Sequence, residues 1–163
     1  MKLYIKQKVF TIADRYEIFD ENKQSIFFVE AKLFSLGAKI TMYDKEQQEV
    51  YRIEQKLFRL LSEYHIYNGA SLIAIIKRKL SLLRPKLSIQ SDYGSFEIIG
   101  NFIGMNFAIT HNEHTIGSIK KAWLSWGDSY ELQVDDQKNA ALFCALTIAI
   151  DHCLFNENHN TQA

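Results

Sequence analysis

The sequence lacks several features that would assign it to a functional class directly. Its 163 residues carry 19 Lys and Arg against 19 Asp and Glu, so there is no net charge to attract nucleic acid over the whole surface. It has a single proline, Pro85, and no Gly/Ser-rich run that would indicate a linker. We therefore expect no nucleic-acid partner, and we predict one domain over residues 1–155 followed by a flexible tail at 156–163.

Cysteine and catalytic motifs are also scarce. The only two cysteines, Cys144 and Cys153, are nine positions apart, which on one helix is about 13 Å and too far for a disulfide. Unpaired thiols, and the absence of a signal-peptide pattern in "MKLYIKQKVF", favour a cytoplasmic location that includes peripheral membrane association. Phosphate-binding glycine loops, nucleophile elbows and HExxH motifs are missing, so we predict no cofactor and no catalytic residue.

The longest apolar run is too short to span a membrane. In "NAALFCALTIAID", residues 140–150 include Thr147 as their one polar residue. These eleven residues extend about 16 Å as a helix, whereas a hydrocarbon core of roughly 30 Å needs about 20 apolar residues. The alanine- and leucine-rich composition predicts a helix over residues 138–155, with Asp135 and Asp136 at its positive end. A helix that is apolar on every face must be buried, so we do not expect a transmembrane protein.

The first half contains an internal repeat with a spacing of 24 residues. The segments "YEIFDENKQSIFFVEAKLFSL" and "ITMYDKEQQEVYRIEQKLFRL" align with each other, and "YHIYNGASLIAIIKRKLSLL" continues the series. Each unit is typical of a short strand, a polar turn and a returning strand in which apolar and charged residues alternate. The second unit is predicted to place these apolar residues on its core face: Tyr51, Ile53 and Leu57.

The alternation continues beyond Pro85, and an opening hairpin in "LYIKQKVFTIAD" brings the total to roughly twelve strands. Strands with one apolar face each must bury that face against another apolar element, and the apolar helix provides one. Closing the sheet into a barrel also removes its exposed edges. The sequence therefore predicts a mainly β fold, a closed antiparallel barrel around a buried C-terminal hydrophobic helix.

Three features together resemble a known family. They are the units ending in "KLFSL" and "KLFRL", the segment "GDSYELQVDD", and the helix "NAALFCALTIAIDHCL" with its acidic Asp151. This combination, over nearly all of residues 1–155, resembles compact bacterial-type members of the LURP-one-related family, which is grouped with tubby C-terminal domains and phospholipid scramblases. The resemblance implies a twelve-stranded barrel around a central helix.

The resemblance carries over no residue's role. Tubby domains bind phosphoinositide headgroups, but no headgroup motif can be matched here residue by residue. Scramblases carry a Ca²⁺-binding segment and palmitoylated cysteines, and this sequence has neither a D-x-[DN]-x-[DN]-G loop nor a cysteine cluster. We therefore expect a non-enzymatic binding or scaffold module, with anionic lipid headgroups or a protein as its partner.

The densest basic cluster is "KRKLSLLRPK", and its cations are Lys77, Arg78, Lys79, Arg84 and Lys86. Five positive charges in ten residues can hold an anionic headgroup or phosphate. The alternative is a strand that uses lysine to remain soluble. The repeat alignment places Lys77 and Lys79 toward solvent and Arg78 toward the core. A smaller patch of the same kind is formed by Lys120 and Lys121.

Two further places carry titratable side chains. "HNEH" brings His111 and His114 to a turn with Glu113, but the spacing matches no zinc site, so we predict a polar turn and no metal. Asp151 ends the apolar helix, where the helix dipole is unfavourable, and a buried carboxylate there needs partners at the end of the barrel. We predict this structural role for Asp151. The alternative is an enzyme with an unrecognised site at the barrel mouth near it.

Overall fold

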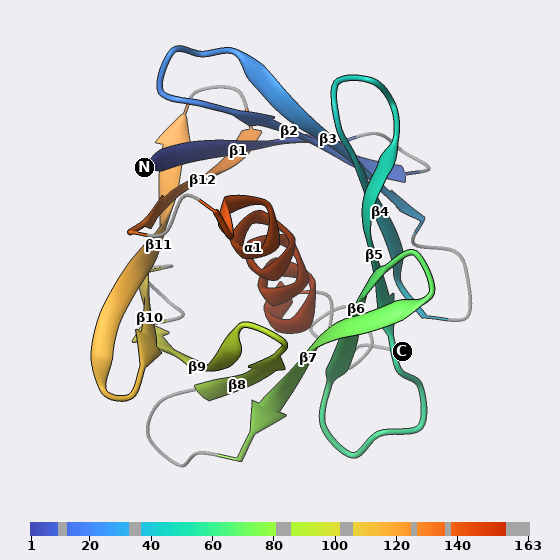
Figure 1. Cartoon of the computed structure of the whole chain (residues 1–163), viewed down its shortest axis with the longest axis vertical. Coiled ribbons are helices and arrows are strands. Elements are labelled where there is room, and N and C mark those ends of the chain that lie inside the picture. Colours follow the sequence, from blue (N-terminus) through green and yellow to red (C-terminus); the bar gives the residue numbers. More distant parts are fainter. Residues whose placement is uncertain are drawn as a thin grey trace.

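The structure is a closed antiparallel barrel of twelve strands with one helix inside it (Figure 1). The computed structural model describes residues 1–9, 13–32, 37–80, 86–101, 106–124, 127–135 and 138–155, so the predicted tail lies outside the described residues. Strands that are consecutive in the chain pair with each other, and β1 pairs with β12 to close the barrel. The predicted fold class is confirmed. The elements are β1 Lys2–Val9, β2 Ala13–Phe19, β3 Ser25–Lys32, β4 Lys39–Tyr43, β5 Glu49–Gln55, β6 Glu63–Asn68, β7 Ser71–Lys79, β8 Lys86–Ser91, β9 Gly94–Asn101, β10 Asn106–His111, β11 His114–Leu124, β12 Gly127–Val134 and α1 Ala140–Phe155.

The three repeat units of the sequence are three successive hairpins, β2–β3, β4–β5 and β6–β7. Ile18, Met42 and Ile66 occupy the same repeat position, and each has an exposed fraction of 0%. The register of each hairpin shifts directly after this residue, which indicates a β-bulge at the same place in all three. The sequence repeat therefore corresponds to a repeated hairpin with a shared irregularity.

The first two of these hairpins also share their turn. Asp20 and Asp44 each accept, at Oδ1, a hydrogen bond of 2.8 Å from the backbone N–H four residues further on. Lys23 and Gln47 have positive φ angles of 61° and 60°, a left-handed conformation that is unfavourable for residues with a Cβ. In the third hairpin Gly69 takes this conformation, with a φ of 55° and without that penalty.

The apolar run of the sequence forms α1, which lies inside the barrel and is surrounded by the strands (Figure 1). Six of its side chains have an exposed fraction of 0%, namely Leu142, Cys144, Ala145, Ile148, Ala149 and Cys153. The apolar faces of the strands and the helix thus bury each other, which is the main favourable term in folding. Within the described part of the chain, no helix is long and apolar enough to cross a membrane.

The start of α1 corrects one detail of the sequence analysis. The helix begins at Ala140, two residues later than predicted, and its first turn contains no acidic residue. Asp135 instead follows β12, and its backbone N–H donates to the carbonyl of Ile116 at 3.2 Å. Asp136 lies outside the described residues. Asp135 precedes Ala140 by five residues and lies outside the first helical turn, so its predicted interaction with the helix dipole stays a prediction.

The direction of the strands gives the barrel two different ends. One end, which we call the turn end, holds the start of α1 and the short connections 20–24, 44–48, 69–70, 92–93 and 112–113. The other, which we call the loop end, is where β1, β3, β5, β7, β9 and β11 finish, and it holds the C-terminal part of α1 and the connection 56–62. The candidate sites of the sequence fall on both ends.

Candidate functional site

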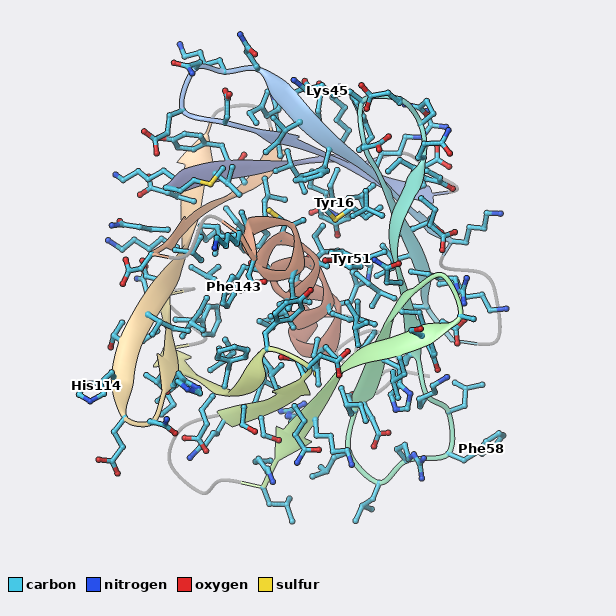
Figure 2. All side chains as sticks on the ribbon, in the orientation of Figure 1. Tyr16, Lys45, Tyr51, Phe58, His114 and Phe143 are labelled. Carbon is cyan, nitrogen blue, oxygen red and sulfur yellow. The ribbon has the colours of Figure 1, made fainter. Side chains whose placement is uncertain are left out.

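A partly buried polar cluster lies at the C-terminal part of α1. Asp151 accepts hydrogen bonds at both carboxylate oxygens, from the hydroxyl of Tyr16 on β2 at 3.1 Å and from the hydroxyl of Tyr130 on β12. The Tyr16 hydroxyl also lies 3.1 Å from Nε2 of His152. Tyr16 lies in the barrel interior, whereas Lys45, Phe58 and His114 lie at the periphery (Figure 2). These bonds connect the helix to two strands of the wall and are what the structural role predicted for Asp151 requires.

The bond from Tyr16 to Asp151 favours one tautomer of His152. Tyr16 has one hydroxyl proton, which it donates to Asp151, so it accepts a hydrogen bond from Nε2–H of His152. Burial lowers the pKa of His152 from 6.5 to about 4, and the imidazole is therefore neutral at pH 7. The polar groups of α1 that face this part of the wall thus have partners within the protein.

The basic cluster predicted from the sequence lies along β7 and β8. Lys77 and Lys79 are exposed and Arg78 is half-buried, as the repeat alignment predicts. Arg84 lies outside the described residues. The exposed cations are at the loop-end half of β7, because this strand runs from the turn at 69–70 toward the connection 80–85.

One carboxylate from the neighbouring strand β6 reaches this cluster. Glu63 Oε2 lies 3.7 Å from Nζ of Lys77 and 3.7 Å from Nε of Arg59, and Glu63 Oε1 lies 2.6 Å from Nε2 of His65. Burial raises the pKa of Glu63, but the hydrogen bond with His65 and the charges of Lys77 and Arg59 outweigh it and hold this pKa below 4.5. Glu63 is therefore ionised at pH 7 and offsets part of the local positive charge.

Two of the remaining predicted cations, Lys86 and Lys120, also lie opposite acidic residues. Lys86 Nζ is 2.8 Å from Oε2 of Glu97 on β9. Lys120 is paired in register with Glu131 on β12. Lys121 is half-buried. These positions are part of the wall of the barrel, and the acids that oppose Lys86 and Lys120 come from the next strand along the chain.

Four exposed apolar side chains gather beside the β7 cations at the loop end. Their exposed fractions range from 40% to 101%. The connection 56–62 carries three of them, and the backbone N–H of Arg78 holds it against β7 by donating to the carbonyl of Ser62 at 3.0 Å. We call these four residues the apolar rim: Leu57, Phe58, Leu60 and Leu80.

The apolar rim was missed because the alternation predicts Leu57 on the core face, and this is wrong. β5 ends at Gln55, and the backbone N–H of Lys56 then bonds to the carbonyl of Glu63 at 2.9 Å, which closes the connection into a loop. Leu57 is consequently 40% exposed and Phe58 is 101% exposed. A period-two pattern does not reveal where a strand ends, because apolar loop residues look like its continuation.

His111 and His114 lie at the ends of β10 and β11 and pair in register. Nδ1–H of His111 donates to the backbone carbonyl of Ser95 at 2.8 Å. Asn112 and Glu113 form a two-residue turn with φ angles of 48° and 67°, which is a geometry that hairpins favour. Among the described residues, no group of three or more His, Cys, Asp or Glu side chains is arranged to hold a metal ion.

Cys144 and Cys153 are both buried in the interior, and no disulfide joins them. Burial raises the pKa of the Cys144 thiol well above its usual value of 9.0. This thiol is therefore protonated at pH 7 and is a poor nucleophile, since the thiolate is the reactive form.

Comparison with a solved structure concerns the fold, and comparison with a family model shows the family. The fold is similar to that of the X-ray structure of a protein from Arabidopsis thaliana, with a TM-score of 0.62 over 92% of this chain and 90% of that chain. At 13% identity this likeness concerns the fold alone. The family model of LURP-one-related proteins matches residues 1–151, and the chain belongs to this family. It is 35% identical, over 157 residues and 96% of each chain, to the uncharacterized protein YxjI of Bacillus subtilis (strain 168). The resemblance predicted from the sequence is confirmed.

Proposed function

We propose that this chain is a non-enzymatic binding module that docks on anionic membrane surfaces through its loop end. The observation that carries the proposal is the apolar rim beside the exposed cations of β7. Exposed apolar side chains next to basic residues are typical of surfaces that meet both the acyl region and the anionic headgroups of a bilayer.

Phe58 supports the proposal because its exposure and its backbone conformation are both energetically unfavourable for a phenylalanine in water. Its side chain is 101% exposed, and its backbone has a φ of 59°, in the left-handed region. That conformation costs roughly 1–2 kcal/mol for a residue with a Cβ, and burial of a phenylalanine side chain contributes about 1.5–3 kcal/mol. A bilayer would provide the burial that the folded chain does not provide for Phe58.

The cations supply the electrostatic part of the same contact. Each Lys or Arg near an anionic leaflet contributes about 1 kcal/mol, and this attraction falls off within a Debye length. Lys77 and Lys79 lie at the same end of the barrel as the apolar rim, whereas Lys45 lies at the turn end. Membrane affinity should therefore depend on the first two lysines and not on the third.

The interior of the barrel supports a function on the outer surface. The space that a ligand-binding barrel would offer is occupied by α1 (Figure 1). Both oxygens of Asp151 already accept hydrogen bonds from tyrosines of the wall, which supports a structural role over the alternative of an enzyme at this position.

The test is cosedimentation with vesicles of phosphatidylcholine, alone or mixed with phosphatidylserine. The wild type should bind the mixed vesicles and should bind less as ionic strength rises. Phe58→Ser with Leu60→Ser should weaken binding about ten-fold or more, because roughly 2 kcal/mol or more of apolar burial is lost. Lys77→Glu with Lys79→Glu should weaken binding to the mixed vesicles specifically.

Two matched controls come from the turn end. Tyr93 is 52% exposed in the connection 92–93, and Lys45 is exposed in the connection 44–48. Tyr93→Ser and Lys45→Glu should leave vesicle binding unchanged. Absence of binding by the wild type, or equal losses in the loop-end and turn-end variants, would overturn the proposal.

A further inference from the structure

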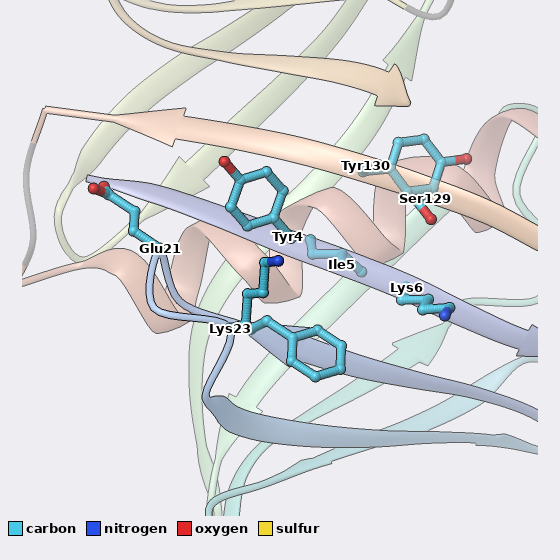
Figure 3. A pocket seen from close by; sticks show the side chains of 8 residues that line it. Tyr4, Ile5, Lys6, Glu21, Lys23, Ser129 and Tyr130 are labelled. Atoms are coloured by element: carbon cyan, nitrogen blue, oxygen red, sulfur yellow. The ribbon is translucent and has the colours of Figure 1, made fainter. Parts of the chain in front are cut away.

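A groove crosses the outer wall of the barrel over β12, β1 and β2, near the turn end (Figure 3). Its volume is about 470 Å³, within the range of about 300–1,000 Å³ that small-molecule sites occupy. Tyr4 and Phe19 provide aromatic surface, and Lys6, Lys23 and Ser129 provide polar groups. Figure 3 shows Lys23 extending from the β2–β3 connection toward Tyr4, with Ser129 on the neighbouring strand β12.

Ser129 is the residue that points to a ligand. It pairs in register with Lys6, on the outward side of β12, because its neighbour Tyr130 faces the interior. Even so, Ser129 is only 3% exposed, and its hydroxyl has no hydrogen-bond partner. Every other buried side-chain N or O atom of the described residues has a partner. Native proteins rarely leave a buried hydroxyl unsatisfied, since this is unfavourable.

The charges of the groove favour an anionic occupant. Within the described ranges neither Lys6 nor Lys23 forms an ion pair. Lys6 lies opposite Glu17 in register, but the ion pair of Glu17 is with Lys8, at 2.6 Å. The one acid that lines the groove, Glu21, accepts a hydrogen bond of 2.6 Å from the backbone N–H of Lys2. Among the side chains that line the groove, two lysines against one glutamate leave a single net positive charge. Glu17, opposite Lys6, lowers the positive potential further, so a singly charged anion fits better than a doubly charged one.

We infer that this groove binds a small amphiphilic carboxylate. Its apolar body lies against Tyr4 and Phe19, its carboxylate is held by Lys6 and Lys23, and the Ser129 hydroxyl donates to it. The aromatic surface selects for an apolar body, and the single net charge selects for a carboxylate over a doubly charged phosphate. This site is separate from the apolar rim, which lies at the other end of the barrel.

The test is isothermal titration of the full chain with sodium decanoate below its micelle concentration, with 1-decanol as the uncharged match. Decanoate should bind saturably and raise the Tm, and 1-decanol should bind at least about ten-fold more weakly. Lys6→Gln with Lys23→Gln should weaken decanoate binding about ten-fold or more. Lys39→Gln with Lys45→Gln, two exposed lysines outside the groove, should leave it unchanged.

Ser129→Ala separates a ligand-binding role from a structural one. It should weaken decanoate binding several-fold while the Tm of the unliganded protein stays the same or rises, because an unsatisfied buried hydroxyl is removed. Absence of saturable binding, equal affinities for decanoate and 1-decanol, or a lowered Tm with unchanged binding in Ser129→Ala would overturn the inference. Phe58→Ser with Leu60→Ser should retain decanoate binding, so the groove and the membrane contact are tested independently.

Discussion

The turn end and the loop end of the barrel are built from different kinds of contact. At the turn end, Asp20 and Asp44 bond to backbone groups within four residues of themselves, so each hairpin completes its own turn. At the loop end, Asp151 bonds to Tyr16, which is 135 residues away in the sequence. Local geometry at the turn end therefore depends on short segments, whereas the loop end depends on the complete barrel. Changes at the loop end should affect stability or binding more strongly.

The largest effect is expected when the loop-end cluster loses its two hydroxyl donors. Tyr16→Phe with Tyr130→Phe leaves the Asp151 carboxylate without both of these hydrogen bonds. A hydrogen bond to a charged group contributes about 1.5–3 kcal/mol, so the free energy of unfolding at pH 7 should fall by about 3–5 kcal/mol in urea titrations. Tyr93→Phe at the turn end should change it by less than about 0.5 kcal/mol. Similar losses in the two proteins would remove the distinction between the ends.

Lowering the pH below 6.5 should reduce the free energy of unfolding through His152, which belongs to the same cluster. The pKa of His152 is lowered to about 4 by burial, against 6.5 in the unfolded chain. Above pH 6.5 the imidazole is neutral in both states, so it adds no pH dependence. As the pH falls from 6.5 toward 4, the unfolded chain binds a proton that the folded chain does not, and the free energy of unfolding decreases, by on the order of 3 kcal/mol in total.

His152→Gln keeps an N–H donor near Tyr16 but does not titrate. Urea titrations between pH 7 and pH 5 should therefore show a shallower loss of stability in this variant than in the wild type. The same slope in both proteins would mean that His152 is accessible to protons in the folded state. This window lies above the range in which the carboxylates Glu17, Glu54 and Glu63, whose pKa values are lowered, begin to contribute.

The smallest effect on stability is expected from glycine substitutions at two residues, one at each end of the barrel, that share a left-handed backbone conformation. Gln47 and Phe58 have φ angles of 60° and 59°, so glycine at either position relieves a similar strain. Each substitution should raise the free energy of unfolding by up to about 1 kcal/mol in urea titrations. Only Phe58→Gly should also reduce vesicle binding. If Gln47→Gly reduced it equally, the loop end would have no special role in membrane contact.

The turn end and the barrel itself could largely be predicted from the sequence. Each strand has one face against the core, so alternation identifies the strands. The 24-residue spacing aligns Ile18, Met42 and Ile66, which are all buried. The apolar run predicted a buried helix because a helix of this composition is apolar on every side. The shared bulges were not predicted, since a bulge changes pairing and not composition.

The candidate sites could be predicted only in part, because they depend on residues that are distant in the sequence. Tyr16 and Tyr130 look like ordinary core aromatics until the helix brings Asp151 to their hydroxyls. Glu63 and Glu97 are not part of the basic segment, but neighbouring strands place them beside it. Ser129 fits the outward pattern of a surface serine, and only the structure shows that it is buried.

The position of α1 in the chain has a consequence for synthesis. The helix follows all twelve strands, yet it is the body that they enclose. A ribosome adds roughly 5–20 residues per second, so for several seconds the nascent chain carries apolar strand faces whose partner has not been made. The sheet can close only when β1 pairs with β12, the last strand to be synthesised. Folding of this barrel is therefore completed only after α1 has been synthesised, and until then we expect chaperones that cover apolar surface to bind the emerging chain.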